Sequence, residues 1–316
     1  MPDEIKEIKT ENKNENLIEV TADGNYDRID VFLSEKLEIS RTRIKSLLFI
    51  HKIIREDRKP LKVSTKVRKG DKFLVKIPPS ANLNSLEAEP IEIDAVYEDP
   101  YIVVINKPSG IIVHPAGEIT RGTLVNGLVY KYPDMKNLRA WQRPGIVHRL
   151  DGGTSGLMVV ARTEKAVIGL QKMFKEREID KNYIALVHGC PKRKEGTVSG
   201  PIDRDPAEPS RMAIVAGGRP SLTGYKVLWT INKISLVQYK LYTGRTHQIR
   251  VHSSGLGCPL VGDIVYGAPE KDSEWGRVFL HSWRLSFNHP ITGGRMTFRQ
   301  NLTPDFLEYI KKLKSA

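Results

Sequence analysis

The sequence predicts an α+β fold: a large domain with a mixed or antiparallel sheet and flanking helices, preceded by a small α+β domain. Three observations support this. Strand and helix patterns do not alternate strictly, adjacent strand patterns are common, and basic residues concentrate near the N-terminus. With 316 residues, of which 40% are hydrophobic and 28% charged, the chain can form two domains and bury a sizeable core.

Residues 1–25 are expected to be a disordered lead-in, because "MPDEIKEIKTENKNEN" alternates in charge and has no apolar core. Residues 26–78 form the predicted small domain. Two helix patterns begin it, with apolar positions at Ile29, Phe32, Leu33 and Leu37 and then at Ile44, Leu47 and Leu48. Ser40 is expected to cap the second helix. The alternating segment "KVSTKVRKGDKFLVKI" predicts a short hairpin turning at residues 69–71.

The formal net charge is +13, and much of it lies in the small domain. Residues 27–77 contain fifteen Lys and Arg against seven Asp and Glu, an excess of eight. On the second helix pattern Arg41, Lys45 and Lys52 fall on nearly one face. A clustered basic face suits contact with a phosphate backbone, so the expected partner is a nucleic acid.

Residues 79–95 are rich in Pro, Asn and Ser and are predicted to be a linker, after which the large domain spans residues 96–316. Strands are expected at "YIVVINKP", "LMVVAR", "KNYIALVHG", "GYKVLWTINKISLVQYKLYTG" (two strands) and "GRMTFR". Helices are expected at "TLVNGLVYKY", "EKAVIGLQKMFKE" and "PDFLEYIKKLK".

Several classes of protein are excluded by composition. No apolar run approaches the about 18 residues needed to span a bilayer, so no membrane partner is expected. Cys190 and Cys258 are too few for a disulfide framework or a cysteine zinc site, which indicates a reducing, cytoplasmic location. His247 and His252 lie five residues apart, on different faces of either a strand or a helix, so no metal site is predicted.

The segment "GIVHRLDGGTSGLMVVAR" at 145–162 places one carboxylate, Asp151, before a Gly-rich turn and an apolar run. It lacks the lysine of a phosphate-binding loop and the final glycine of a nucleophile elbow. It also has no second aspartate copy for a protease dyad and no clustered carboxylates for a two-metal nuclease. The residues alone leave two readings open: Asp151 acts chemically from a loop on a rigid strand, or it merely forms the turn.

Five segments together resemble the RluA-type pseudouridine synthases. "HRLDGGTSGLMVVAR" is similar to the catalytic motif of that family, and the other four occur in the family's order: "NKPSGIIVHP", "KNYIALVHG", "TGRTHQIRVHSSGLGCPLVGDIVYG" and "LHSWRLSFNHP". The basic segment 27–77 more weakly resembles the S-four-type RNA-binding domain, which often precedes this catalytic domain. It lacks the usual Gly after the second helix and the usual Val-Asn-Gly turn.

The resemblance implies isomerisation of uridine in RNA without a cofactor or metal. Asp151 would be the catalytic carboxylate, which attacks C1′, attacks the uracil ring, or removes the 2′ proton. Tyr183 would stack on the uracil or take the C5 proton, and Arg245 would pair with the aspartate. Arg149 would fill the stack that the everted base leaves or hold a phosphate, and Leu280 would form an apolar wall for the uracil.

Large-subunit ribosomal RNA is the expected substrate, transfer RNA is the alternative, and a cytoplasmic monomer is expected. Two other readings remain. A non-catalytic RNA-binding or ribosome-assembly protein would share the basic charge but would not need Asp151, Tyr183 and Arg245 together. The second reading is a different RNA-modifying enzyme, but a nuclease would need a metal and a glycosidase normally needs a second carboxylate.

Overall fold

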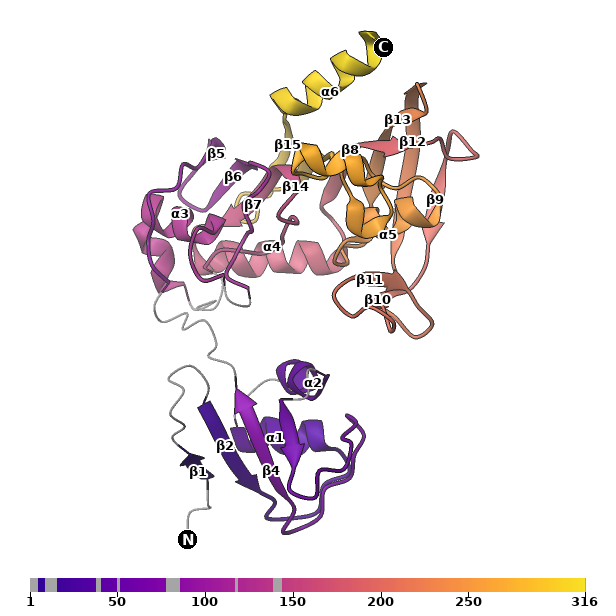
Figure 1. Ribbon diagram of the computed structural model, residues 1–316. Helices are drawn as coiled ribbons and strands as arrows, with labels where there is room; N and C mark the ends of the chain where they lie inside the picture. The colour runs from indigo at the N-terminus through magenta and orange to yellow at the C-terminus, as the bar shows by residue number, and fades with distance from the viewer. Residues whose placement is uncertain are drawn as a thin grey trace. The chain divides into compact units, whose positions relative to one another are not determined.

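A computed structural model describes residues 5–8, 16–37, 41–49, 52–77, 86–116, 119–138 and 144–315 (Figure 1). The chain divides into two compact units, Met1–Leu83 and Asn84–Ala316. The expected α+β architecture is present, since each unit combines helices with its own sheet.

The N-terminal unit is a four-stranded antiparallel sheet in the order β1-β2-β4-β3, with two helices. Its elements are β1 (Ile5–Ile8), β2 (Asn16–Thr21), α1 (Ile29–Leu37), α2 (Arg41–Phe49), β3 (Ile53–Arg55) and β4 (Lys72–Ile77). Both predicted helices are confirmed. Their apolar positions are buried with side chains of the sheet, except that Leu37 is partly buried, and the core includes Phe32, Ile44, Val20, Phe73 and Val75.

Two expectations for this unit need correction. Asn16–Thr21, placed in the disordered lead-in, forms β2 and pairs with β4 along its whole length, burying Val20. The predicted hairpin has only its second arm, β4. In the first arm Val67 makes an isolated bridge to Tyr26, and the true partners of β4 are β2 and β3. Local alternation shows that a segment can be a strand, but it does not identify the partner. Ser40 lies outside the described residues.

The larger unit is built on a nine-stranded mixed sheet in the order β5-β6-β7-β14-β8-β13-β12-β9, with β15 also paired to β14. β7 and β14 are parallel, and every other pairing is antiparallel. The strands are β5 (Ala95–Glu98), β6 (Ile102–Lys107), β7 (Ser155–Ala161), β8 (Asp180–His188), β9 (Glu195–Ser199), β12 (Leu222–Ile231), β13 (Ile234–Leu241), β14 (Leu280–Asn288) and β15 (Arg295–Arg299).

The remaining elements flank this sheet. They are α3 (Leu124–Lys131), α4 (Glu164–Glu176), α5 (Gln248–Gly255), α6 (Pro304–Ser315), the short 3₁₀ helices η2 (Pro133–Asn137), η3 (Ile264–Tyr266) and η4 (Glu270–Trp275), and a two-stranded ribbon of β10 (Ile202–Arg204) and β11 (Met212–Ile214). The predicted strands and helices of this unit are all present. β5, β9, β10, β11, β14 and α5 were not predicted.

The segment 86–94, expected to be the end of a linker, packs on the larger unit. The Nδ2 of Asn126 donates to the Glu87 carbonyl, the Glu89 amide donates to the Asn126 carbonyl, and Ile93 is buried. The earlier part of the expected linker, residues 79–85, lies outside the described residues.

Gly156 allows the central parallel pair to form. It has a φ of 107° and faces Ser282 across β7 and β14. A Cβ on Gly156 would lie 2.4 Å from the Ser282 carbonyl oxygen, closer than any real side chain approaches backbone. The glycine after Ser155 in the Thr-Ser-Gly motif therefore brings the catalytic-motif strand against the strand that carries Leu280.

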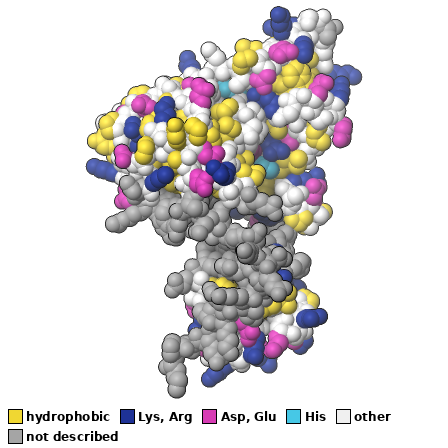
Figure 2. All heavy atoms as spheres, turned by 60° about the vertical axis from the view of Figure 1, so that its left-hand side comes forward, with side chains coloured by type: hydrophobic (Ala, Val, Ile, Leu, Met, Phe, Trp, Pro, Cys, Tyr) yellow, Lys and Arg dark blue, Asp and Glu magenta, His cyan; other side chains and the backbone are white. Residues whose placement is uncertain are grey.

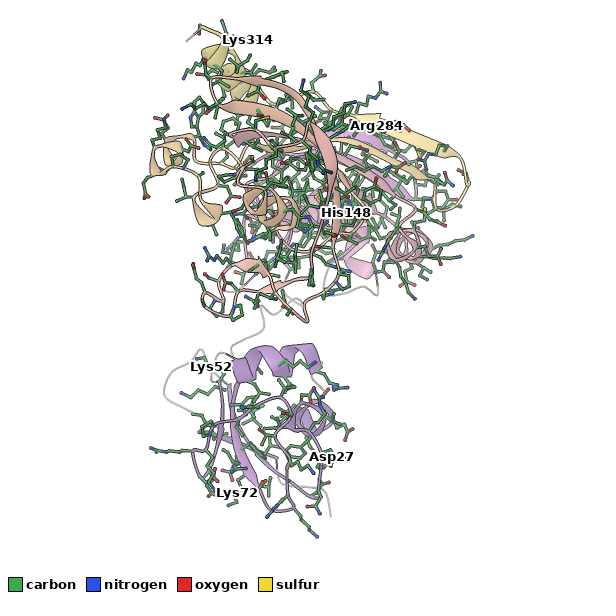
Figure 3. All side chains as sticks on the ribbon, turned by 90° about the vertical axis from the view of Figure 1, so that its right-hand side faces the viewer. Asp27, Lys52, Lys72, His148, Arg284 and Lys314 are labelled. Atoms are coloured by element: carbon green, nitrogen blue, oxygen red, sulfur yellow. The ribbon has the colours of Figure 1, made fainter. Side chains whose placement is uncertain are left out.

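No helix within the described part of the chain is long and apolar enough to cross a membrane. The face seen in Figure 2 shows acidic and basic side chains interspersed on the larger unit, without a field of one sign. Figure 3 shows Lys52 and Lys72 at opposite ends of the N-terminal sheet. Basic side chains of that unit are therefore not all on one edge.

Candidate active site

Asp151 lies in a tight turn directly before β7. The Thr154 amide donates to the Asp151 carbonyl, and β7 that follows is buried over its whole length. Neighbouring groups hold the turn. Lys107 Nζ donates to the carbonyls of Pro108, Ile111 and Gly152, and Ser109 Oγ donates to the Gly153 carbonyl. Hydrogen bonds from the "NKPSG" segment therefore fix the backbone of Gly152 and Gly153, directly after Asp151.

The residues before Asp151 are anchored through His148. Its Nε2 accepts a hydrogen bond from the Val159 amide at 3.0 Å, and its ring stacks on Phe174. His148 is half-buried in the larger unit and is labelled in Figure 3. Burial, and to a smaller extent the charge of Lys181, lower the pKa of His148 to about 3, so the ring stays neutral and keeps its acceptor nitrogen.

The carboxylate of Asp151 is partly exposed and forms an ion pair with Arg250. Oδ2 of Asp151 lies 3.8 Å from Nη1 of Arg250. The guanidinium is held from the other side by the fully buried carboxylate of Asp263, which accepts from Nε at 2.7 Å and from Nη2 at 2.8 Å. The ring of Tyr266 also lies against it, with its centroid 4.8 Å from Cζ. A bidentate pair of this kind fixes the guanidinium's orientation.

Tyr183 forms one wall of the site from the middle of the sheet. It lies on β8 opposite Tyr239 of β13 and Ser282 of β14. Burial raises the pKa of the Tyr183 phenol above its usual value, and the negative charge of Asp151 raises it further. The hydroxyl is therefore protonated at neutral pH.

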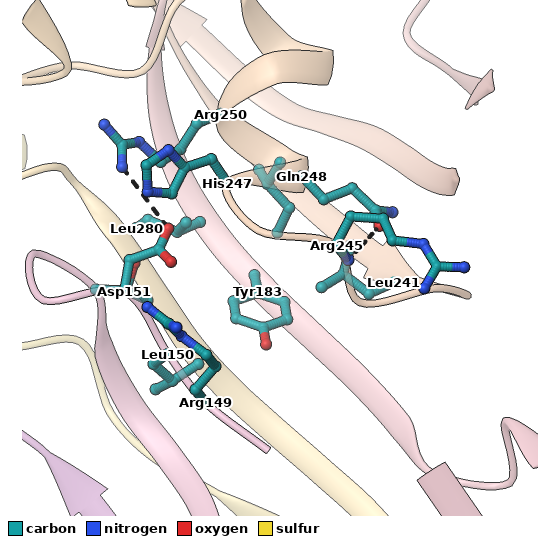
Figure 4. A pocket seen from close by; sticks show the side chains of 12 residues that line it. Arg149, Leu150, Asp151, Tyr183, Leu241, Arg245, His247, Gln248, Arg250 and Leu280 are labelled. Carbon is teal, nitrogen blue, oxygen red and sulfur yellow. Dashed lines mark hydrogen bonds and ion pairs between the residues drawn. The ribbon is translucent and has the colours of Figure 1, made fainter. Parts of the chain in front are cut away.

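These groups surround one pocket, shown in Figure 4, with about 360 Å³ of space that is partly open to solvent. The structure brings together all five residues predicted for the large domain: Arg149, Asp151, Tyr183, Arg245 and Leu280 all line it. His247, Gln248, Ile249 and Arg250 contribute from the start of α5 and the turn before it. Asp151 is the one carboxylate among the lining residues that the structure describes.

The expected partner of Asp151 is wrong. The ion pair is made by Arg250, whereas Arg245 Nε donates to the Pro220 carbonyl at 3.1 Å and its guanidinium points away from Asp151 (Figure 4). Both arginines belong to "TGRTHQIR". Gln248 lies between the two arginines. Its Oε1 accepts a hydrogen bond from the Arg245 amide in the turn before α5, whereas Arg250 lies within α5, which begins at Gln248. The motif supplied the residue type, but only the fold shows which arginine reaches the carboxylate.

The predicted RNA-contacting residues of the N-terminal unit differ in their surroundings. Arg41 forms an ion pair with the buried Asp30 at 3.0 Å, although half of its side chain is exposed. Lys45 is exposed on α2, and Lys52 is half-buried just after it. Part of the charge of Arg41 is thus compensated within the unit, while Lys45 is open to a partner.

Sequence reasoning missed Arg250, Asp263 and Lys107 as parts of the site. Arg250 and Asp263 lie inside the segment "TGRTHQIRVHSSGLGCPLVGDIVYG", and Lys107 lies inside "NKPSG". The motifs therefore contain all three residues but do not indicate what each one does. Lys107 is completely buried, as is the Asp263 side chain, and a buried charge requires a partner. No group of three or more metal-binding side chains occurs among the described residues.

Comparisons with known proteins identify the family of the chain. A family model described as RNA pseudouridylate synthase matches residues 101–254. The ribosomal large subunit pseudouridine synthase D of Nitrosomonas europaea is 36% identical over 313 residues, which cover 96% of this chain and 90% of that protein. An uncharacterized RNA pseudouridine synthase of Bacillus subtilis, YlyB, is 37% identical over 302 residues, covering 95% of this chain and 99% of that protein.

Solved structures share the fold. Human RNA pseudouridylate synthase domain containing 4 aligns with a TM-score of 0.55 and 26% identity, over 70% of this chain and 93% of that one. Human RNA pseudouridylate synthase domain containing 1 aligns with a TM-score of 0.53 and 28% identity, over 76% and 98% of the two chains. With its pocket, its sheet and these relatives, the chain belongs to the RNA pseudouridine synthase family.

Proposed function

We propose that this enzyme converts uridines of large-subunit ribosomal RNA to pseudouridine, with Asp151 as the essential carboxylate. One observation carries the proposal: Asp151 is aimed into a pocket by an arginine that a second, buried carboxylate holds in place. The substrate class follows from relatives named as ribosomal large subunit pseudouridine synthase D. Transfer RNA is the alternative substrate.

The reaction breaks the N1–C1′ bond of uridine and forms a C5–C1′ bond, and the C5 proton is lost while N1 gains one. Atoms therefore balance without a co-substrate. Asp151 acts on C1′, on the uracil ring or on the 2′ proton, and each route uses the ionised carboxylate. Arg250 lies beside it as a fixed positive charge that orients the carboxylate.

The uracil must leave the base stack before Asp151 can reach it. We assign Leu280, which is buried in the pocket wall, to one side of the everted ring and Tyr183 to stacking against it. The raised pKa of Tyr183 supports this, since a phenol that stays protonated is a poor resting-state base. Arg149 is exposed at the pocket, and no ion pair joins it to another described residue, so it is available to hold the RNA.

The N-terminal unit is proposed to act as an S-four-type RNA-binding domain. Its exposed Lys45 and partly exposed Arg41 lie on α2, in the segment with the largest excess of basic residues. Residues 26–78 would select the RNA, and the larger unit would carry out the chemistry in a cytoplasmic, monomeric enzyme.

Competing activities fit the pocket less well. A glycosidase needs two carboxyl groups free to act, but the second carboxylate near this site, Asp263, has both oxygens bound by Arg250. A nuclease of the two-metal type needs clustered carboxylates, whereas Asp151 is alone among the described lining residues.

The proposal is tested by mapping pseudouridine in cellular RNA with and without the gene, and by release of tritium from [5-³H]uridine-labelled transcripts of large-subunit ribosomal RNA. Loss of one or more pseudouridines in that RNA, and their restoration by the wild-type gene, is expected. An unchanged ribosomal RNA map with a site lost from transfer RNA would favour the alternative substrate. Full activity of Asp151→Asn would refute the catalytic assignment.

A further inference from the structure

Arg245 does not pair with Asp151 as expected, and the residues around it indicate a different role. Its Nε donates to the carbonyl of Pro220, the residue that follows Arg219. Only one of its five N–H donors is used by this hydrogen bond. Arg219 is exposed, and its charge acts on Arg245.

Two further cations, Lys181 and Arg177, lie near Arg245. The ammonium of Lys181 lies 3.7 Å from where a Cβ would stand on Gly244, the residue before Arg245. The same ammonium lies 5.6 Å from the ring of Phe174, in the last turn of α4. Arg177 ends that helix in a left-handed conformation and is exposed. Four cations from three segments of the chain therefore lie near one another, and one of them, Arg245, lines the pocket.

The positive charges in this group repel one another. The pKa of Arg245 is lowered chiefly by burial and then by the charges of Arg219 and Arg177. The pKa of Lys181 is lowered to about 8, again by burial first and then by the charges of Arg177 and Arg245. Such an arrangement is unfavourable unless an anion binds it.

No carboxylate of the described residues compensates these four side chains. The nearest acidic residue in sequence to Lys181, Asp180, is bound instead by Arg295 at 2.9 Å and lies 3.6 Å from Lys240. Elsewhere on the surface, by contrast, Arg211 pairs with Asp205 and Arg55 pairs with Asp57. What sets the cluster apart is that four cations lie close together with no ion pair to a described carboxylate.

We propose that Arg177, Lys181, Arg219 and Arg245 form a phosphate-binding cluster that holds the RNA backbone next to the everted uridine. This inference rests on the proposed function, since it takes RNA as the ligand. Arg245 lines the pocket and so marks where the cluster meets the target nucleotide. The other three extend the contact to neighbouring phosphates.

The test compares two double variants. Arg177→Asn with Arg219→Ala removes two cluster charges, and asparagine tolerates the left-handed conformation of residue 177. Lys311→Ala with Lys314→Ala removes two exposed charges from α6, which packs on Phe279 and Trp275 rather than on the pocket. Each is measured in the Asp151→Asn background for binding of a labelled transcript of large-subunit ribosomal RNA across a salt series.

The cluster variant is expected to bind about tenfold more weakly, with a salt slope reduced by about 1.4, corresponding to two lost contacts with single-stranded phosphates. The α6 variant should retain both values. Wild-type binding by the cluster variant, or an equal loss in the α6 variant, would overturn the proposal.

Steady-state kinetics test the phosphate-binding cluster separately from the proposed function. With Asp151 intact, the cluster variant should raise KM about tenfold and leave kcat within about twofold, as expected for contacts that only bind. A fall in kcat at unchanged KM would overturn the binding role. If the wild-type enzyme releases no tritium from the transcript, the proposed function fails, while the salt series still decides the fate of the cluster.

Discussion

Asp151 and Arg250 form the central ion pair of the site, 3.8 Å apart, and the arginine is fixed by Asp263 rather than by the RNA. The carboxylate thus has a positive neighbour before substrate arrives. Preorganised charge of this kind needs no rearrangement during the reaction. The first two predictions follow from this pair.

Replacing Asp151 by Asn should lower pseudouridine formation by a factor of about 10³ or more, because the amide is neither a nucleophile nor a base. RNA binding should survive, since the side chain is nearly isosteric. Tritium release and filter binding measure the two properties. Activity near the wild-type level would remove Asp151 from the chemistry.

Arg250→Lys should lower kcat by about 10²-fold, because a lysine cannot bind both oxygens of Asp263 and also reach Asp151. Arg245→Lys is the matched control and should affect mainly KM, since Arg245 is not paired with Asp151. Steady-state kinetics on the same transcript distinguish the two. A larger fall in kcat for Arg245→Lys would restore the pairing expected from the sequence.

Gly156→Ala should destabilise the larger unit by about 3 kcal/mol or more, because its Cβ would collide with the backbone of Ser282. Gly217→Ala is the control: it also has a positive φ, but no atom lies within 4 Å of where its Cβ would stand, so only about 1–2 kcal/mol is expected. Urea unfolding followed by tryptophan fluorescence reports on this unit, which contains all four tryptophans of the chain. Equal losses for the two variants would argue against the close approach of β7 and β14.

Acid should destabilise the larger unit through His148. Its pKa is about 3 in the folded chain, against an ordinary value of 6.5, so between these values the unfolded chain binds a proton that the folded chain does not. The free energy of unfolding therefore falls as the pH drops from 6.5 toward 3, by up to about 1.4 kcal/mol per pH unit. His148→Gln keeps a hydrogen-bond acceptor and should flatten this slope in urea unfolding at a series of pH values. His281, whose pKa burial lowers to about 4, should maintain a residual slope in the variant. An identical slope for both proteins would contradict the lowered pKa of His148.

Deleting residues 1–83 should leave a folded larger unit, because the two units have separate hydrophobic cores. RNA binding should weaken, since the deleted segment contains the basic region 27–77. Circular dichroism and the salt series measure the two effects. Loss of cooperative unfolding in the truncated protein would show that the units depend on each other.

Much of the secondary structure followed from local patterns. Continuous apolar runs identified β6 and β7, and the helical period identified α1, α4 and α6. β14 was missed because Leu280–Asn288 mixes buried His281, Ser282 and Ser286 with apolar residues, so its sequence lacks a clear strand pattern. A central strand with buried polar groups is recognised only when its hydrogen-bonding neighbours are known.

The sequence by itself determined the family resemblance, the α+β class and the residue types of the site, because motifs and periodicity are local properties of the chain. Tertiary structure decided which arginine meets Asp151, that Asp263 fixes it, and that Arg245 joins three distant cations. These outcomes depend on the register of nine strands and on where α5 begins, which place side chains from distant segments within a few ångströms. Such distances arise from packing of the whole sheet, and no single stretch of sequence contains them.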